Sequence, residues 1–120
     1  MRDHRQLRAF QLADQLTLAV YETTRNFPSS EQFGLVHQMR RASVSVPANI
    51  VEGCGRSTPH DYVRFLDIAM GSLRELGYLL SLAQRLGYVQ LDSAQPLQDA
   101  HDEAARTLGG LIQANRRELS

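Results

Sequence analysis

The sequence predicts an all-α protein folded as an antiparallel up-down-up-down four-helix bundle. Apolar residues recur at spacings of three and four through four long segments, which is the pattern of helices that bury one face. Proline, glycine and serine interrupt that pattern only briefly between the segments, and short connections imply antiparallel neighbours. We therefore predict helices over residues 6–26, 31–54, 59–86 and 92–119.

Length and composition indicate one globular domain over residues 1–120. The hydrophobic fraction of 42% is ordinary for a soluble protein, and no apolar run approaches the roughly 18 residues of a membrane span. The N-terminal residues lack the apolar stretch of a signal peptide, and a single cysteine excludes an intramolecular disulfide. We expect a cytoplasmic protein without membrane association.

The first and fourth predicted helices each carry one apolar stripe. The stripe of the first comprises Phe10, Ala13, Leu16, Thr17, Val20 and Thr24. The first helix should end at Phe27-Pro28, because the residue before a proline avoids helical geometry. Asp92 is a good N-cap for the fourth helix, whose stripe comprises Leu97, Ala100, Ala104, Leu108, Leu111, Ile112 and Asn115. We expect the fourth helix to be an outer helix packed on one side only.

The second and third predicted helices each carry two apolar stripes. The core-facing set comprises Leu35, Met39, Ala42, Val46, Ile50, Gly53, Tyr62, Phe65, Leu66, Ala69, Leu73, Leu76, Leu80 and Ala83. The second set comprises Val36, Val44, Pro47, Val51, Cys54, Ile68, Leu79, Leu82 and Leu86. A small bundle needs one buried stripe per helix, so the second set predicts a subunit interface. The alternative is a central helix that is apolar all round.

The ends of these two helices have recognisable signals. Ser29 and Ser30 are N-cap candidates for the second helix, with Glu31 in its first turn. Ser57 or Thr58 can cap the third helix, followed by Pro59 in the first turn and the capping-box acid Asp61. Gly87 should end the third helix, and Gly71 inside it would allow another helix to approach closely.

Polar residues in the second helix need partners. Pro47 cannot donate to the carbonyl of Ser43, so a kink is expected there, with Ser43 or Ser45 bonding the freed carbonyl. Asn49 lies on the core-facing side and should have a designated partner. We expect a buried or inter-subunit polar network in which Arg41 pairs with Glu75; its predicted members are Arg41, Asn49, Glu52 and Glu75.

The arginines near the second connection have two interpretations. All 13 Lys+Arg residues are Arg and the formal net charge is zero, which argues against non-specific duplex binding by a basic surface. Neutral net charge does not exclude a local patch of arginines. The candidate contacts to nucleic acid or another partner are Arg40, Arg56 and Arg64. The alternative is that the local arginines form salt bridges to Glu52, Glu75 and Asp61 within an oligomer.

No set of residues indicates catalysis. The Glu-x-x-His pair of a di-iron bundle is absent, and the consecutive His101, Asp102 and Glu103 point to different sides of a helix, as on a solvated face. Cys54, near Arg56 and His60, is the one candidate nucleophile, but a buried interface cysteine explains it more simply. We expect a non-enzymatic protein without metal or cofactor.

Several motifs together resemble one protein family. The second helix contains E-x-F-G-L-x-x-Q-x-R-R-A-S-x-S-V-P-A-N-I-x-E-G, from Glu31 to Gly53. Around it lie V-Y-x-x-T-x-x-F-P (residues 20–28), R-F-L-x-I-A-x-G-S-L-x-E-L (64–76) and L-G-Y (86–88). These motifs resemble the four-helix-bundle proteins named for the intervening sequences of bacterial 23S rRNA genes, a family that includes the accessory variability protein of diversity-generating retroelements.

This resemblance carries its own expectations. It implies an antiparallel four-helix bundle and a ring-like homopentamer whose biochemical role is undefined. The retroelement branch is basic, binds nucleic acid and associates with a reverse transcriptase, whereas this chain is neutral. We expect a homo-oligomeric scaffold or interaction protein. The alternative is an RNA- or DNA-binding accessory protein that acts with a nucleic-acid enzyme such as a reverse transcriptase.

Overall fold

The computed structural model describes residues 2–119 and consists of four long helices. They are α1 (Arg8–Thr24), α2 (Leu35–Cys54), α3 (Pro59–Arg85) and α4 (Leu91–Leu119). Single 3₁₀ turns, η1 (His4–Gln6) and η2 (Ser29–Glu31), precede α1 and α2. Residues 2–119 contain no strand, so the prediction of an all-α protein with four helices is confirmed.

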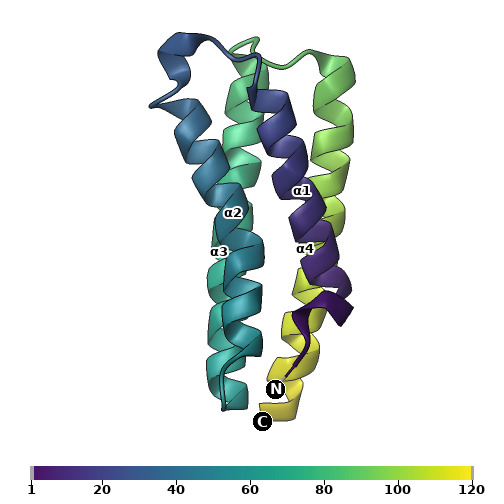
Figure 1. Ribbon diagram of the computed structural model, residues 1–120. Helices are drawn as coiled ribbons and strands as arrows, with labels where there is room; N and C mark the ends of the chain where they lie inside the picture. The colour runs from purple at the N-terminus through teal and green to yellow at the C-terminus, as the bar shows by residue number, and fades with distance from the viewer. Residues whose placement is uncertain (1, 120) are drawn as a thin grey trace.

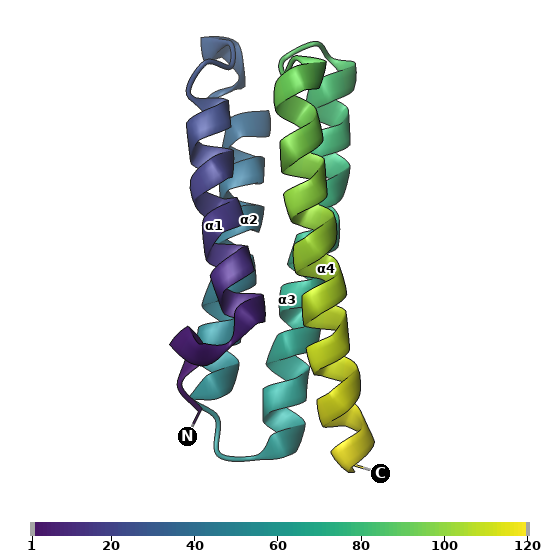
Figure 2. The same cartoon turned by 90° about the vertical axis from the view of Figure 1, so that its right-hand side faces the viewer.

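The helices form an elongated bundle of 46 × 24 × 21 Å. Each helix contacts two others: α1 packs on α2 and α4, and α3 packs on the same two (Figures 1 and 2). Arg41 of α2 meets Glu75 of α3, and further along α2 Ser45 meets the earlier residue Ser72, so these helices run in opposite directions. No helix within residues 2–119 is long and apolar enough to cross a membrane.

The core lies along the inward faces of all four helices. The predicted core stripes of α2 and α3 are buried, except that Phe65 is only half-buried. On α4 the buried members of the predicted stripe are Leu97, Ala104, Leu108 and Ile112. Most of the remaining α4 surface is exposed or half-buried, which agrees with the single apolar stripe predicted for this helix.

The first two helices begin later than predicted. Leu7 is extended and separates η1 from α1, so α1 begins at Arg8 rather than at residue 6. Gly34, with φ −108° and ψ −106°, separates η2 from α2, so α2 begins at Leu35 rather than at residue 31. Neither Ser29 nor Ser30 caps α2, because the Glu31 carboxylate accepts the N–H of Leu35 instead (3.3 Å).

The predicted signals at the ends of α3 are confirmed. The Thr58 hydroxyl accepts the N–H of Asp61 (3.1 Å), and Pro59 is the first helical residue. Gly87 follows the helix with φ 81°, and the N–H of Tyr88 reaches back to the carbonyl of Ala83 (3.0 Å), the pairing of a Schellman cap. The fourth helix differs slightly from its prediction, since α4 begins at Leu91 and contains Asp92 in its first turn.

Pro47 lies buried inside α2, and a neighbouring helix satisfies the carbonyl that it leaves free. The hydroxyl of Thr17 on α1 donates to the carbonyl of Ser43 (2.8 Å). The expectation that Ser43 or Ser45 bonds this carbonyl was wrong. The Ser43 hydroxyl donates to the carbonyl of Arg40 (2.8 Å), and the Ser45 hydroxyl pairs with that of Ser72 (2.8 Å).

Two glycines of the α2–α3 pair have different surroundings. A Cβ atom at Gly53 would lie 3.0 Å from the Cβ of Phe65, so α2 and α3 approach closely at this level. A Cβ atom at Gly71 would meet nothing within 4 Å. Within the chain, the close approach therefore occurs at Gly53, and the space beside Gly71 is open.

Candidate functional site

The nine residues predicted to form a subunit interface divide into two groups by burial. Exposed or half-buried are Val44, Val51, Ile68, Leu82 and Leu86. Buried inside the same chain are Val36, Pro47, Cys54 and Leu79. These four side chains are buried within the single chain, so they do not contribute to an outer stripe.

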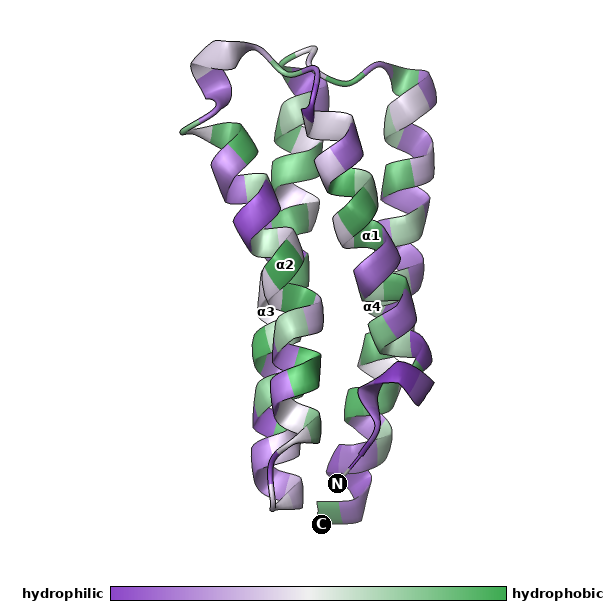
Figure 3. Ribbon diagram, in the orientation of Figure 1, coloured by the Kyte–Doolittle hydropathy of each residue, from purple (hydrophilic) through white to green (hydrophobic). Residues whose placement is uncertain are grey.

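The five residues that remain accessible form what we term the α2/α3 surface. Val44 and Val51 are seven residues apart and share one face of α2, as Ile68, Leu82 and Leu86 share one side of α3. The Ser45–Ser72 contact sets these two faces beside each other. Apolar and polar bands alternate on the side of α2 turned to the viewer in Figure 3.

Polar side chains bridge α2 and α3 beside this surface. The amide of Asn49 donates to the carbonyl (2.7 Å) and hydroxyl (3.0 Å) of Ser45, so the expected partner of Asn49 lies in its own helix. Arg41 pairs with Glu75 as expected, at 3.5 Å. Their side chains are 61% and 43% exposed, so in the single chain this pair lies on the surface rather than in a buried network.

An arginine–aromatic cluster occupies the end of the bundle at which the chain passes from α2 to α3. We define it as Arg2, Arg56, Arg64, Tyr62 and Phe65. The guanidinium groups of Arg56 and Arg64 each lie 4.6 Å from the centre of the Phe65 ring, and that of Arg2 lies 3.8 Å from the centre of Tyr62. Carboxylates are close by, because Arg56 pairs with Glu52 (2.6 Å) and Arg64 with Asp61 (3.5 Å).

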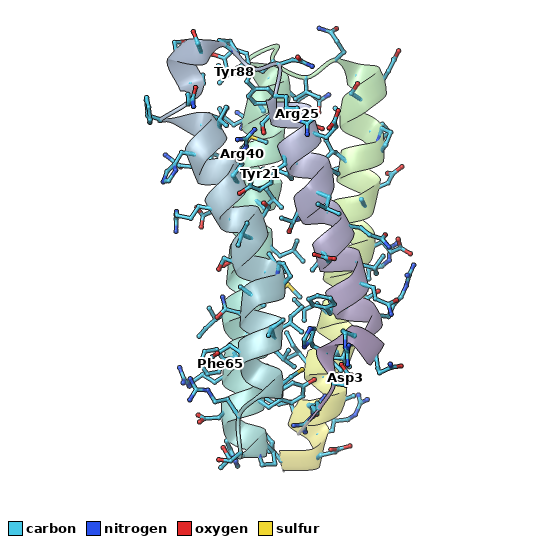
Figure 4. All side chains as sticks on the ribbon, in the orientation of Figure 1. Asp3, Tyr21, Arg25, Arg40, Phe65 and Tyr88 are labelled. Carbon is cyan, nitrogen blue, oxygen red and sulfur yellow. The ribbon has the colours of Figure 1, made fainter. Side chains whose placement is uncertain are left out.

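Arg40 does not belong to this cluster. It lies in the first half of α2, 14 residues before the helix ends at Cys54, or about 21 Å along the helix axis, whereas Phe65 is near the opposite end of the bundle (Figure 4). Its guanidinium donates to the Thr24 hydroxyl (2.9 Å) and lies 4.6 Å from the centre of the Tyr21 ring. The structure therefore does not bring the three predicted contact arginines into one patch.

Instead, Arg40 lines an open hollow between α1 and α2, which we term the α1–α2 groove. Its volume is about 490 Å³, and its main lining residues are Tyr21, Phe33, His37, Arg40, Arg41 and Val44. Phe33 is 93% exposed, and no lining residue is acidic. The helical pattern did not reveal this groove, because Phe33 precedes α2 and the hollow forms only when α1 and α2 pack together.

Cys54 lies in surroundings that suit a buried thiol. Its side chain is 2% exposed, and this burial raises the pKa of the Cys54 thiol. A nucleophilic cysteine needs a depressed pKa, so the environment works against that alternative. His60 is exposed in the first turn of α3. Residues 2–119 contain no group of three or more His, Cys, Asp or Glu side chains that could hold a metal ion.

His101 is not on the solvated face where it was predicted. Its side chain is 13% exposed, and its Nε2 atom lies 2.9 Å from the carbonyl of Leu73 on α3. Because a carbonyl only accepts, this nitrogen is the donor. The Nδ1 atom lies 3.1 Å from the Asp102 carboxylate, which also only accepts, so this nitrogen donates to it when the ring carries both protons. The contact with His101, together with a hydrogen bond from Gln98, lowers the pKa of Asp102. His101 thus joins α4 to α3.

Comparison with known proteins identifies the family. The sequence profile described as 23S rRNA-intervening sequence protein matches residues 5–110. A crystal structure of a protein of unknown function from the S23 ribosomal protein family of Bacteroides thetaiotaomicron has a TM-score of 0.80 and 20% sequence identity, covering 88% of this chain and 95% of the other. That likeness shows the shared fold. No curated protein has significant similarity to the chain. Because the profile spans α1 to α3 and much of α4, the chain belongs to the 23S rRNA-intervening sequence protein family.

Proposed function

We propose that this protein is a non-enzymatic scaffold that assembles with copies of itself through the α2/α3 surface. One observation carries the proposal: Val44, Val51, Ile68 and Leu86 are 39% to 51% exposed on a single chain. Apolar side chains gathered on one side of a small protein are typical of a contact surface. The net charge of zero supports assembly, since copies do not repel one another through their overall charge.

The proposed assembly is a closed ring, and the family resemblance implies five copies. A ring differs from a twofold dimer because each copy uses two different surfaces, one toward each neighbour. The α2/α3 surface supplies one of these. Such a ring would present many identical faces to a partner, which suits a scaffold.

The experiment that tests self-assembly is light scattering on a sizing column, with absorbance recorded at 260 and 280 nm. We expect a multiple of the 13.5 kDa chain mass. Val51→Glu or Leu82→Glu should reduce that mass while leaving the helical circular dichroism intact, because a carboxylate is disfavoured in an apolar contact. Leu91→Glu, at an exposed site outside the surface, is the matched control. If both surface variants keep the parental mass, the α2/α3 surface is not the interface.

A second candidate function is RNA or DNA binding as an accessory to a nucleic-acid enzyme such as a reverse transcriptase. The arginine–aromatic cluster favours it, because guanidinium groups contact phosphates and aromatic rings stack on bases. The paired carboxylates of Glu52 and Asp61 weaken its positive field.

Labelled RNA tests this candidate. The expected result is a salt-sensitive mobility shift that is lost on Arg56→Glu or Arg64→Glu and retained on Arg85→Glu, which lies at the far end of α3. Excess absorbance at 260 nm that high salt removes from the sizing-column peak would also place this function first. If neither labelled RNA nor labelled DNA is shifted at low salt, this candidate is eliminated.

A further inference from the structure

The α1–α2 groove and the outer face of α1 have complementary chemistry. We infer that the groove of one copy receives the α1 ridge of a second copy, where the α1 ridge denotes Asp14, Leu18 and Glu22. This inference rests on the proposed self-assembly and names the second surface that a ring requires.

The groove offers an ordered, cationic and aromatic surface. Arg40 is held in place by its hydrogen bond to Thr24 and by the Tyr21 ring beneath its guanidinium (Figure 4). Phe33 projects beside it with 93% of its surface exposed. His37 and Arg41 complete a lining without a carboxylate. A partner that fits this groove should bring both apolar surface and negative charge.

The α1 ridge has those two properties. Leu18 is 68% exposed near the middle of α1, and Asp14 and Glu22 lie four residues before and after it, on the same face of the helix. Among residues 2–119 the Asp14 carboxylate has no hydrogen bond or ion pair, while Glu22 pairs with Arg25 on the open surface (2.9 Å). An ion pair of that kind contributes little to stability, so the pair opposes docking only weakly.

The two surfaces also match in length. Asp14 and Glu22 are separated by about 12 Å along α1, and the groove extends roughly 10 Å along α2 from His37 to Val44. In its own chain the ridge does not fill the groove, because Leu18 remains exposed. A second copy therefore has to supply the ridge. Contact between two different surfaces of identical chains is the heterologous type that generates rings.

Val44 connects this contact with the α2/α3 surface, because it belongs to both. One side of a subunit interface would then consist of the groove and the adjoining α2/α3 surface. The other side would be the α1 ridge of the next copy.

The test uses one variant of each surface, followed by mixing. Leu18→Arg places a cation on the ridge, and Phe33→Glu places a carboxylate in the groove. Each variant alone should lose the parental mass and run as the 13.5 kDa chain. An equimolar mixture should recover a one-to-one complex, because the Phe33→Glu chain keeps its ridge and the Leu18→Arg chain keeps its groove. Leu91→Arg is the control for an exposed leucine and should keep the parental mass.

The possible outcomes separate this inference from the proposed function. If the wild-type protein is a multimer and both variants keep its mass, the groove and ridge are not the interface, while self-assembly stands. If each variant dissociates but the mixture gives no complex, the contact is not between ridge and groove. If the wild-type protein is monomeric, self-assembly and this inference both fail. The helical circular dichroism of each variant must equal that of the wild-type protein, so that a lower mass does not result from unfolding. Mixing Phe33→Ala with Leu18→Ala repeats the experiment without introducing new charges.

Discussion

The hydroxyl of Thr17 on α1 donates a hydrogen bond of 2.8 Å to the main-chain carbonyl of Ser43 on α2. In an uninterrupted helix the N–H of the residue four positions later would occupy that carbonyl. Pro47 holds that position and has no N–H. A side chain of the neighbouring helix therefore replaces a bond that α2 cannot make within itself.

This relationship predicts a coupling between Thr17 and Pro47. Thr17→Val keeps the shape of the side chain but leaves the buried carbonyl without a donor, so we expect a loss of about 1–3 kcal/mol in the free energy of unfolding. In a Pro47→Ala background the restored N–H supplies the bond, and Thr17→Val should then cost less. Urea denaturation of the two single variants and the double variant measures the coupling. Equal losses in both backgrounds would mean that Thr17 acts independently of Pro47.

A second prediction concerns the contact of His101 with α3. A Cβ atom at Gly77 would lie 2.6 Å from the Nε2 atom of His101, so Gly77→Ala must displace the imidazole from the Leu73 carbonyl. We expect a net loss of about 1–3 kcal/mol, although alanine favours helix formation. Gly71→Ala on the same helix meets open space and should instead stabilise by up to about 1 kcal/mol. Thermal unfolding monitored by circular dichroism compares the two.

A double variant identifies the cause of the Gly77 effect. When His101→Ala removes the ring, Gly77→Ala should no longer be destabilising relative to that background. A loss that persists without the imidazole would place the strain elsewhere in α3.

Local sequence patterns predicted those features of the fold that depend on local chemistry. The Thr58 cap and the Gly87 stop depend on a few adjacent residues, and the stripe of α4 depends on helical period alone. The start of α2 was missed because Gly34 and the 3₁₀ turn before it interrupt a pattern that otherwise reads as continuous helix.

The remaining errors arise from tertiary contacts that a helical wheel does not contain. Cys54 lies on an apolar stripe, but the wheel does not show that the N-terminal segment runs beside it, with the Arg2 N–H donating to its carbonyl (3.3 Å). His101 and Thr17 both bond main-chain carbonyls of another helix, and such acceptors have no side-chain signature. The α1–α2 groove likewise depends on the packing of two helices.

A third prediction distinguishes a surface ion pair from a buried one. Glu75→Ala should change the free energy of unfolding of the single chain by no more than about 0.5–1 kcal/mol, because the Arg41–Glu75 pair is largely exposed and its N–O distance is 3.5 Å. Equilibrium denaturation at low protein concentration measures this. A loss of several kcal/mol in the free energy of unfolding would mean that the Arg41–Glu75 pair is buried, as expected for a buried or inter-subunit polar network.

The last prediction is a pH dependence caused by Asp102. Hydrogen bonds from His101 and Gln98 lower the pKa of Asp102 below 3.8 in the folded state. The bonded carboxylate therefore stabilises the fold above the unfolded-state pKa, and this contribution is lost as the pH falls through the lower folded-state pKa. Because Asp102 is half-exposed, Asp102→Asn should cost only about 0.5 kcal/mol at pH 7, and the difference from wild type should narrow below pH 3.8. Denaturation at pH 7 and pH 3 measures the difference in the free energy of unfolding between Asp102→Asn and wild type at each pH. Asp14→Asn is the control, because the Asp14 carboxylate is exposed and has no hydrogen bond among residues 2–119. A difference that stays constant between the two pH values would show that the folded state does not depend on the charge of Asp102.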